Sequence, residues 1–195
     1  MTRGATARLF VAADLPPAAR AELAHWARAA AVSARGSGGH LRLLAPDSLH
    51  VTLCFLGSVV VAEIEAIADI VSGSPAETVG ELSLGAPLWL PARRPRALAV
   101  ELHDDAQGAL GSLQSELART LVAIGALKPE RRRFRPHVTV ARMRSADAPQ
   151  ERSLPATPAL AFAPVALTLY RSWLGPTEAT YEALARCPLG TSEEP

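Results

Sequence analysis

Two short stretches of the chain each place a threonine two residues after a histidine. The first is HVTLCFLG, from His50 to Gly57, and the second is HVTVAR, from His137 to Arg142. The alternation of residue types predicts a β-strand for both, and residues two apart on a strand share a face. Each motif would therefore present one imidazole beside one hydroxyl, with an apolar reverse face to bury.

Both strands are thus expected to have one chemical face and one buried face. The side chains expected on the chemical face are His50 and Thr52 in the first strand and His137 and Thr139 in the second. Those expected on the opposite face are Val51, Leu53 and Phe55 in the first strand and Val138 and Val140 in the second.

Two such His-Thr pairs, facing each other across a cleft, could cleave a phosphodiester. In that reaction a base activates the nucleophile on one side of phosphorus, and an acid protonates the departing oxygen on the other. Histidine suits both roles because its unperturbed pKa lies near neutrality. Threonine hydroxyls can donate hydrogen bonds to the non-bridging oxygens as charge builds on them. A single HxT would be more typical of a buried histidine bonded to the backbone, but the pair predicts a catalytic site.

Arginine supplies almost all of the positive charge and is concentrated just before the second motif. Arg131, Arg132, Arg133 and Arg135 precede His137, and the rigid fork of donors on arginine suits phosphate. The formal net charge of +1 argues against broad polyanion binding, so any nucleic-acid contact should be local. We interpret the first three of these arginines as candidate RNA contacts, with a solvated loop as the alternative.

The other histidines do not form a metal-binding pattern. His25, His40 and His103 lack a partner at ligand spacing, and neither HxT motif has the paired-ligand spacing of common zinc sites. A zinc site made of His50, His137 and a third ligand such as His103 is supported by residue type alone. We therefore expect no metal.

The composition is that of a globular protein. With 195 residues, of which 49% are hydrophobic and 20% charged, the chain can bury a core in one domain or in two small packed lobes. The opening segment MTRGATARLFVAADLPP lacks the apolar run and cleavage site of a signal peptide, and no segment approaches the roughly 20 apolar residues of a membrane span. We expect a cytoplasmic protein. Cys54 and Cys187 lie in apolar contexts typical of buried free thiols.

Periodicity along the chain predicts alternating strands and helices. The elements expected first are a strand over 8–14, a helix from Pro17 with Leu23, Trp26, Ala27 and Ala30 on its buried stripe, a strand closed by Gly57, and a helix over 61–73. Those expected next are two neighbouring strands over 81–90 and 96–103, and a helix from about Asp104 with Leu110, Leu113, Leu117, Leu121 and Ile124 buried. The last are strands over 137–142, 166–174 and 180–189, although the final segment would also suit a helix. The pattern indicates an α+β protein with antiparallel sheets.

These features resemble the 2H phosphoesterase superfamily, which is defined by two HxT/S motifs, and within it the bacterial RNA 2′,3′-cyclic phosphodiesterases, also described as 2′-5′ RNA ligases. The matching segments follow the family's order over almost the whole chain and are RLFVAADLPP, SLHVTLCFLG, RPRALAV, FRPHVTVAR, LYRSWLGP and TYEALARCPL. The resemblance implies two pseudo-symmetric lobes with antiparallel sheets and outer helices around a central cleft, with one motif from each lobe. It also implies a metal-free reaction, without a cofactor, on RNA ends or nucleotides that bear a 2′,3′-cyclic phosphate.

The resemblance also implies roles for single residues. His137 would be the general base on water and His50 the general acid to the leaving O3′, with Thr52 and Thr139 binding the phosphate. Arg142 matches an arginine that contacts the phosphate. A regular strand would turn Arg142 to the face opposite Thr139, so the strand must end, twist or bulge there.

Phe10 is the last residue for which the resemblance implies a role. It lies where an aromatic ring can line the nucleotide pocket, with a buried strand residue as the alternative.

Several alternatives stay open. The chain could act as a 2′-5′ RNA ligase, as a phosphodiesterase on 2′-5′ oligonucleotides or cyclic ADP-ribose phosphate, or as a non-catalytic module that binds nucleotides or RNA. Both histidines and both threonines are present, which weighs against a binding module, since binding needs no acid and base. We expect one domain over residues 1–195 with two interleaved lobes, a flexible tail over 190–195, and a monomer.

Overall fold

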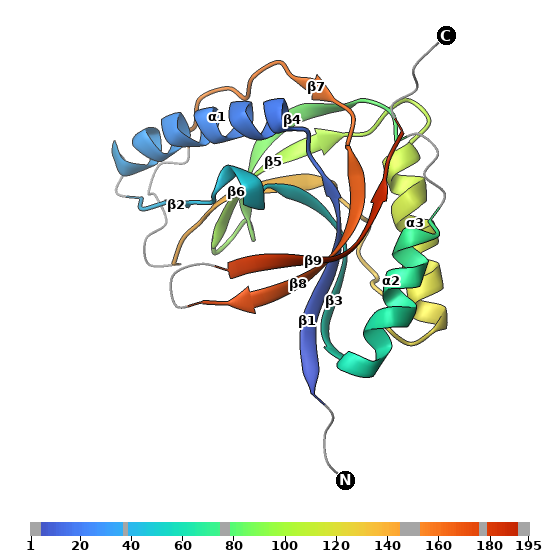
Figure 1. Ribbon diagram of the computed structural model, residues 1–195. Helices are drawn as coiled ribbons and strands as arrows, with labels where there is room; N and C mark the ends of the chain where they lie inside the picture. The colour runs from blue at the N-terminus through green and yellow to red at the C-terminus, as the bar shows by residue number, and fades with distance from the viewer. Residues whose placement is uncertain (1–4, 37–38, 75–78, 145–152, 176–178, 191–195) are drawn as a thin grey trace.

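The computed structural model describes residues 5–36, 39–74, 79–144, 153–175 and 179–190. The strands within these ranges form one twisted antiparallel sheet, with the helices on its outside (Figure 1). The strands are β1 (Thr6–Asp14), β2 (Arg42–Leu43), β3 (His50–Val60), β4 (Leu82–Leu90), β5 (Ala97–His103), β6 (His137–Arg142), β7 (Ala161–Phe162), β8 (Ala166–Leu174) and β9 (Ala179–Pro188). The helices are α1 (Pro17–Gly36), α2 (Ile64–Ser72) and α3 (Ala109–Ala123), with 3₁₀ turns η1 (Pro46–Ser48) and η2 (Val61–Glu63). The predicted α+β class is confirmed.

The sheet consists of two halves whose strands correspond in order, counted outward from the centre. The strand order is β7-β4-β5-β6-β3-β1-β8-β9, with β2 paired to β6. We call β3, β1, β8 and β9 the first half, and β6, β5, β4 and β7 the second half. The halves meet where β3 pairs with β6 through Val51 and Val138, both of which are fully buried. The two motif-bearing strands therefore lie side by side at the centre of the sheet.

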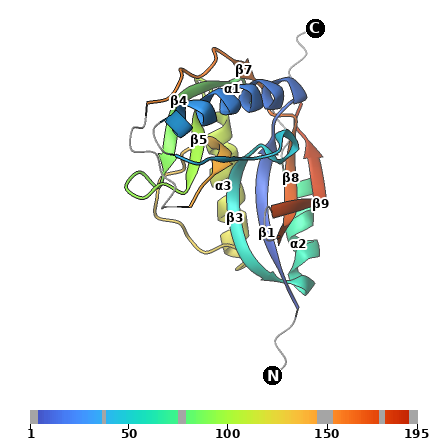
Figure 2. The same ribbon diagram turned by 90° about the vertical axis from the view of Figure 1, so that its left-hand side faces the viewer.

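The helices pack across the two halves. The helix α1 contacts β2 and β6. The helix α2 contacts β8, β9 and α3, and α3 also contacts β3 (Figure 2). A helix from the beginning of the chain thus covers a strand of the second half, and a later helix covers a strand of the first. The stripe predicted for α1 is confirmed as buried, and its members are Leu23, Trp26, Ala27 and Ala30. One continuous apolar core results.

The third helix begins later than its sequence pattern indicates. It starts at Ala109, so Asp104 and Asp105, which the expected start near Asp104 would put in the first turn, precede it instead. Asp105 accepts a hydrogen bond from the amide of Ala109, and Asp104 accepts bonds from the amides of Leu110 and Gly111. These carboxylates occupy the amides that a helix start leaves without an intrahelical partner, so they act as caps.

Two further boundaries differ from the expectation. The strand β3 continues through Gly57 to Val60, because Gly57 adopts a φ of 73° that lets the strand bulge without ending. Ile124 follows the last residue of α3 and is 49% exposed, so it does not extend the buried stripe. The predicted tail lies outside the described residues except for Gly190.

The remaining expectations for the C-terminal part and the thiols are confirmed. The final segment is a strand, β9, which pairs antiparallel with β8 along its length. Cys54 and Cys187 are both buried and free. Within the described ranges, no helix combines the length and the apolar character that spanning a membrane requires.

Candidate active site

The junction of the two halves sets the two HxT motifs side by side in opposite directions. Because β3 and β6 are antiparallel and pair through Val51 and Val138, the register brings His50 toward Thr139 and Thr52 toward His137. The two valines point into the core, whereas the histidines and threonines are only partly buried. One sheet face therefore carries both imidazoles and both hydroxyls.

Arg142 joins this face through a bulge in β6. Thr139 pairs with Ala99 and Ala141 pairs with Leu98, which leaves Val140 as an extra residue. Arg142 then pairs with Ala97, two residues from Ala99 and hence on the same face as Thr139. Of the three departures expected there, an end, a twist or a bulge, the strand has the bulge.

The strand β3 has the same irregularity at the same place, which the sequence did not indicate. Thr52 pairs with Ala12 and Cys54 pairs with Val11, so the residue between them, Leu53, is the extra one. As a result Phe55 shares the face of Thr52, and the expectation that Phe55 lies on the opposite face is wrong. Its ring is 52% exposed.

Phe55 is flanked by an aromatic and a cationic side chain. In the ladder between β1 and β3 it pairs with Phe10. The guanidinium carbon of Arg8 lies 4.8 Å from the centroid of the Phe55 ring. The site face thus includes an exposed aromatic surface next to the first motif.

Both catalytic candidates are oriented by a backbone carbonyl two residues earlier. The Nδ1 atom of His50 lies 2.8 Å from the carbonyl oxygen of Ser48, and that of His137 lies 2.8 Å from the carbonyl oxygen of Arg135. A carbonyl oxygen only accepts hydrogen bonds, so Nδ1 carries a hydrogen in each ring. Nε2 is therefore the nitrogen that can accept or release a proton.

The ring of His50 is enclosed by aromatic side chains. Phe10 stacks on it at a centroid distance of 4.8 Å, and Tyr181 meets it edge-on at 5.4 Å. Tyr170 stacks on Phe10 at 5.3 Å, and its ring centroid lies 6.2 Å from that of His50. Only 4% of Phe10 is exposed, so its observed contact is with His50, while a contact with the nucleotide stays a prediction.

Behind this cluster lies a buried carboxylate. Asp14 is 3% exposed and pairs with His50 across the ladder between β1 and β3. Its oxygens accept hydrogen bonds from the hydroxyls of Thr168 at 2.9 Å and Tyr170 at 2.8 Å. The Nε atom of Arg186 lies 3.7 Å from the same carboxylate.

Desolvation dominates the electrostatics of His50. Burial lowers the pKa of His50 from 6.5 to about 4. The bond to Ser48 and the charge of Asp14 act in the opposite direction, and the charges of Arg142 and Arg20 lower the pKa further. In the absence of a ligand, His50 is therefore neutral at physiological pH.

Tyr170 stays a hydrogen-bond donor over the same pH range. Burial, followed by its bond to Asp14, raises the pKa of its hydroxyl to about 12.

The surroundings of His137 are more polar. Its ladder partner on β5 is Glu101, which forms an ion pair with Nε of Arg135 at 2.7 Å. The hydrogen bond from Arg135 lowers the pKa of Glu101. The carboxylate nearest to this histidine in the ladder is thus already paired with a cation.

The arginines preceding the second motif have a different position. Arg131, Arg132 and Arg133 lie in the segment between α3 and β6, and all three are exposed. Their contact with RNA stays a prediction.

Several residues of the site were missed at the sequence level, namely Asp14, Phe55, Thr168, Tyr170, Tyr181 and Arg186. A usable signal was present for three of them, because Asp14 lies four residues after Phe10 on one strand and therefore shares its face, and Thr168 and Tyr170 share a face by the same rule. Nothing local places these strands next to the first motif.

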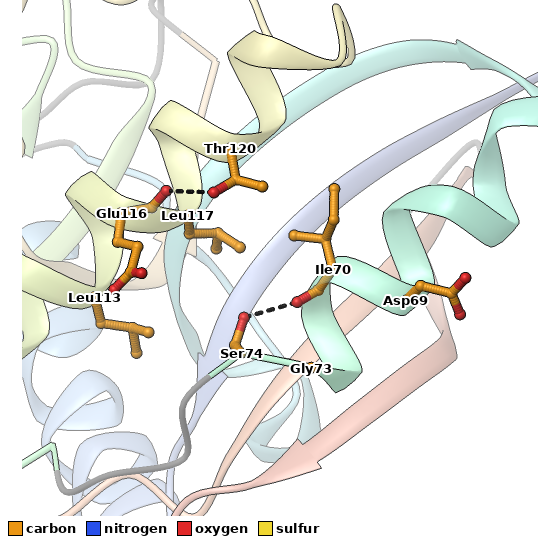
Figure 3. A pocket seen from close by; sticks show the side chains of 8 residues that line it. All are labelled: Asp69, Ile70, Gly73, Ser74, Leu113, Glu116, Leu117 and Thr120. Atoms are coloured by element: carbon orange, nitrogen blue, oxygen red, sulfur yellow. Dashed lines mark hydrogen bonds between the residues drawn. The ribbon is translucent and has the colours of Figure 1, made fainter.

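A pocket between α2 and α3 lacks this chemistry (Figure 3). It has a volume of about 210 Å³ and contains no histidine. The hydroxyls of Ser74 and Thr120 donate to the carbonyls of Ile70 and Glu116 in their own helical segments. Within the described ranges there is also no cluster of three or more potential metal ligands of the His, Cys, Asp or Glu type.

Comparison with known proteins agrees with this geometry. The family model described as LigT like Phosphoesterase matches residues 100–179. The RNA 2′,3′-cyclic phosphodiesterase of Escherichia coli K12 is 30% identical over 192 residues, which cover 93% of this chain and 96% of the relative. The chain belongs to the LigT-like phosphoesterase family. It is accordingly a member of a family of phosphoesterase enzymes, as the sequence predicted.

Solved structures of the family extend the match to the fold. E. coli LigT complexed with 3′-AMP has a TM-score of 0.75 and 29% identity, covering 96% of this chain and 100% of LigT. The protein TT0787 of Thermus thermophilus also has a TM-score of 0.75, with 26% identity and coverage of 93% and 97%. The LigT-like family match therefore includes both halves of the sheet.

Proposed function

We propose that this LigT-like phosphoesterase hydrolyses terminal 2′,3′-cyclic phosphates of RNA to 2′-phosphates by acid-base catalysis with two histidines. The observation that carries the proposal is the arrangement at the junction, where two HxT motifs and Arg142 share one sheet face. The E. coli relative is an RNA 2′,3′-cyclic phosphodiesterase, and its LigT structures include complexes with 3′-AMP and with phosphate. These support a nucleotide end as the substrate class.

The proposed reaction is a single displacement at phosphorus. Nε2 of His137 accepts a proton from water as the water oxygen bonds to phosphorus. The bond between phosphorus and O3′ breaks, its electron pair passes to O3′, and Nε2 of His50 gives O3′ a proton. The products are a 2′-phosphate and a 3′-hydroxyl. Exchange with solvent then removes the proton from His137 and restores one to His50.

The remaining polar groups of the face stabilise the developing negative charge. Thr52 and Thr139 donate hydrogen bonds to the non-bridging oxygens, and Arg142 supplies a positive charge from the bulged end of β6. These donors are fixed by strands, so they need little reorganisation during the reaction.

The low pKa of His50 requires that the substrate itself help to protonate this residue. In the free protein the charge of Arg142 adds to desolvation in lowering the pKa of His50. An anionic phosphate next to Arg142 cancels that charge and lies near the imidazole, and both effects favour the imidazolium. Binding of the substrate is therefore accompanied by uptake of a proton at His50.

Phe55 offers a surface for the nucleobase. Its ring is 52% exposed and lies on the same face as Thr52. Stacking on an aromatic ring tolerates any base, which fits an enzyme that reads the cyclic phosphate rather than the sequence.

A panel of substrates tests the proposal. The purified protein is incubated with the four nucleoside 2′,3′-cyclic phosphates and with short RNAs that end in a cyclic phosphate, and the 2′- and 3′-phosphate products are resolved. We expect 2′-phosphates from both kinds of substrate. The double variant His50→Ala/His137→Ala serves as the control for contaminating activity. Formation of 3′-phosphates, or ligation of RNA ends without hydrolysis, would contradict the proposal.

The same assay tests the expected independence of metal. We propose that the enzyme acts as a cytoplasmic monomer without a metal or other cofactor. Turnover should therefore be unchanged after treatment with EDTA and dialysis. Loss of turnover that a divalent ion restores would refute metal-free catalysis.

A further inference from the structure

Each motif histidine has a carboxylate opposite it on the neighbouring strand. Asp14 on β1 pairs with His50, and Glu101 on β5 pairs with His137. These positions correspond in the two halves, because β1 flanks β3 as β5 flanks β6. The two carboxylates differ in the groups that bind them.

Glu101 is compensated by a cation. Its Oε1 atom lies 2.7 Å from Nε of Arg135, and the side chains of Glu101 and Arg135 are 23% and 59% exposed. Solvent and the guanidinium both weaken the field of this carboxylate at His137.

Asp14 is held mainly by neutral donors. The hydroxyls of Thr168 and Tyr170 bond to its two oxygens, which satisfies the carboxylate without cancelling its charge. Arg186 is farther away, at 3.7 Å, and its side chain is 58% exposed, so its charge is partly screened. The Asp14 side chain is 4% exposed, and its carboxylate acts through a medium of low polarity.

We propose that Asp14 is a positioning residue that makes His50, rather than His137, the proton donor of the proposed hydrolysis. The proposal rests on the two-histidine mechanism above. A negative charge next to His50 favours its imidazolium, whereas the carboxylate opposite His137 is already paired with Arg135. Tyr170 links the Asp14 carboxylate to the His50 ring. It donates a hydrogen bond to Asp14 and stacks on Phe10, which in turn stacks on His50.

The other groups around His50 are consistent with this role. The charges that act on His50 are those of Asp14 on β1, Arg20 on α1 and Arg142 on β6, and the rings of Tyr170 on β8 and Tyr181 on β9 lie 6.2 Å and 5.4 Å from it, while His137 on β6 shares its sheet face. The two arginines oppose protonation of His50, and the Asp14 carboxylate favours it. A bound phosphate offsets the arginines, which leaves the carboxylate as the protein's own charge favouring imidazolium.

The test compares Asp14→Asn with Glu101→Gln in the dependence of kcat on pH. In the proposed mechanism the acidic limb reports the base and the alkaline limb reports the acid. Loss of the Asp14 charge lowers the pKa of His50 in the complex, so the alkaline limb should move to lower pH by about one unit. Glu101→Gln should leave the alkaline limb in place. An unmoved alkaline limb in Asp14→Asn, or a shift of its acidic limb instead, would overturn the proposal.

A titration without turnover separates this proposal from the proposed function. The imidazole of His50 is followed by NMR in the free wild-type and Asp14→Asn proteins. A lower pKa of His50 in the variant is expected even if the cyclic phosphate is the wrong substrate. An unchanged value would refute the role of Asp14, whatever the substrate panel shows.

A second variant, at Arg186, keeps the buried carboxylate of Asp14 and removes only the cation near it. Arg186→Met removes an exposed cation that screens Asp14, so it should raise the pKa of His50 in the same titration and move the alkaline limb of kcat to higher pH. The shift is opposite in sign to that of Asp14→Asn, which general destabilisation would not produce. If Asp14→Asn does not fold, the absence of a rise in Arg186→Met overturns the proposal.

Discussion

The two halves of the sheet use one backbone design to place two histidines in different environments. In each half a threonine follows the histidine by two residues, an alanine lies opposite the threonine, and an extra residue comes next. The ring of His50 is packed against Phe10 and lies near a buried carboxylate, whereas His137 has an ion pair beside it. The backbone thus determines where the imidazoles point, and the side chains on the neighbouring strands determine their proton affinity.

The halves also differ at the residue that follows the bulge. The second half places Arg142 there, and the first half places Phe55 at the equivalent point. One equivalent position thus supplies a charge suited to phosphate, and the other supplies an apolar ring suited to a base. The near-symmetry of the fold allows one small face to bind two chemically different parts of a nucleotide.

Removal of either imidazole should have the largest effect. We expect His50→Ala and His137→Ala each to lower kcat by on the order of 10²-fold to 10⁴-fold, the usual range for a positioned acid or base. The measurement is turnover of a nucleoside 2′,3′-cyclic phosphate, with circular dichroism as the control for folding. Near-normal turnover in a folded His137→Ala protein would show that the two halves do not share the chemistry.

Arg142→Ala should have the next largest effect. Loss of a charged hydrogen bond to phosphate, worth about 1.5–3 kcal/mol, should lower kcat/KM by roughly 10-fold to 100-fold. The loss should be equal for cyclic mononucleotides and for RNA ends, since both present the same reacting group. The matched variant Phe55→Ala should change KM more than kcat. A loss confined to RNA in Arg142→Ala would place this residue away from the scissile phosphate.

The buried environment of His50 should make the protein less stable in acid. His50 stays neutral down to about pH 4 in the folded protein but ionises near pH 6.5 when unfolded, so the unfolded state binds more protons in between. The free energy of unfolding should therefore fall as the pH drops from 6.5 to 4, with a contribution from His50 on the order of 3 kcal/mol. Urea unfolding across this range, compared with His50→Gln, measures that contribution. An identical pH dependence in the two proteins would contradict it.

The loop arginines should have the smallest effect on catalysis. Replacement of Arg131, Arg132 and Arg133 by alanine should leave cyclic mononucleotides nearly unaffected. It should weaken binding of RNA oligonucleotides and reduce the salt slope by up to about 2, at ~0.7 per phosphate contact. Binding measured at several salt concentrations gives the slope. Equal losses of activity on mononucleotides and on RNA would indicate that these arginines contact the reacting phosphate.

The sequence was sufficient for the strands and for the shared face of each histidine and threonine, because these depend on local spacing. Local spacing alone would turn Arg142 to the opposite face, and only the family resemblance called for it beside Thr139. The expectation that the strand ends, twists or bulges near Arg142 followed from the conflict between strand geometry and the family's phosphate contact. The equivalent bulge in β3 could not be predicted, since no such conflict marked Phe55. The expected central cleft remains a prediction.

The carboxylate next to His50 was beyond local inference for a different reason. Asp14 ends a strand that pairs with β3 about forty residues later and with β8 about 150 residues later, as its partners His50 and Ala166 show. Such a site depends on long-range register, which periodicity does not encode. The start of α3 was misjudged because a capping aspartate and one in the first turn give similar sequence signals.

The extra residue after each threonine also shifts, by one position, which later residues share the face of that threonine. Along a regular strand all members of one face have positions of the same parity, and His50 and Thr52 follow this rule, but Phe55 does not. Deletion of Val140 would remove the bulge and leave Arg142 two residues after Thr139, so Arg142 would keep its face on a regular strand that is one residue shorter. In this interval, a homologue that lacks the bulge aligns correctly only with a one-residue gap, and an ungapped alignment would equate side chains from opposite faces of the sheet.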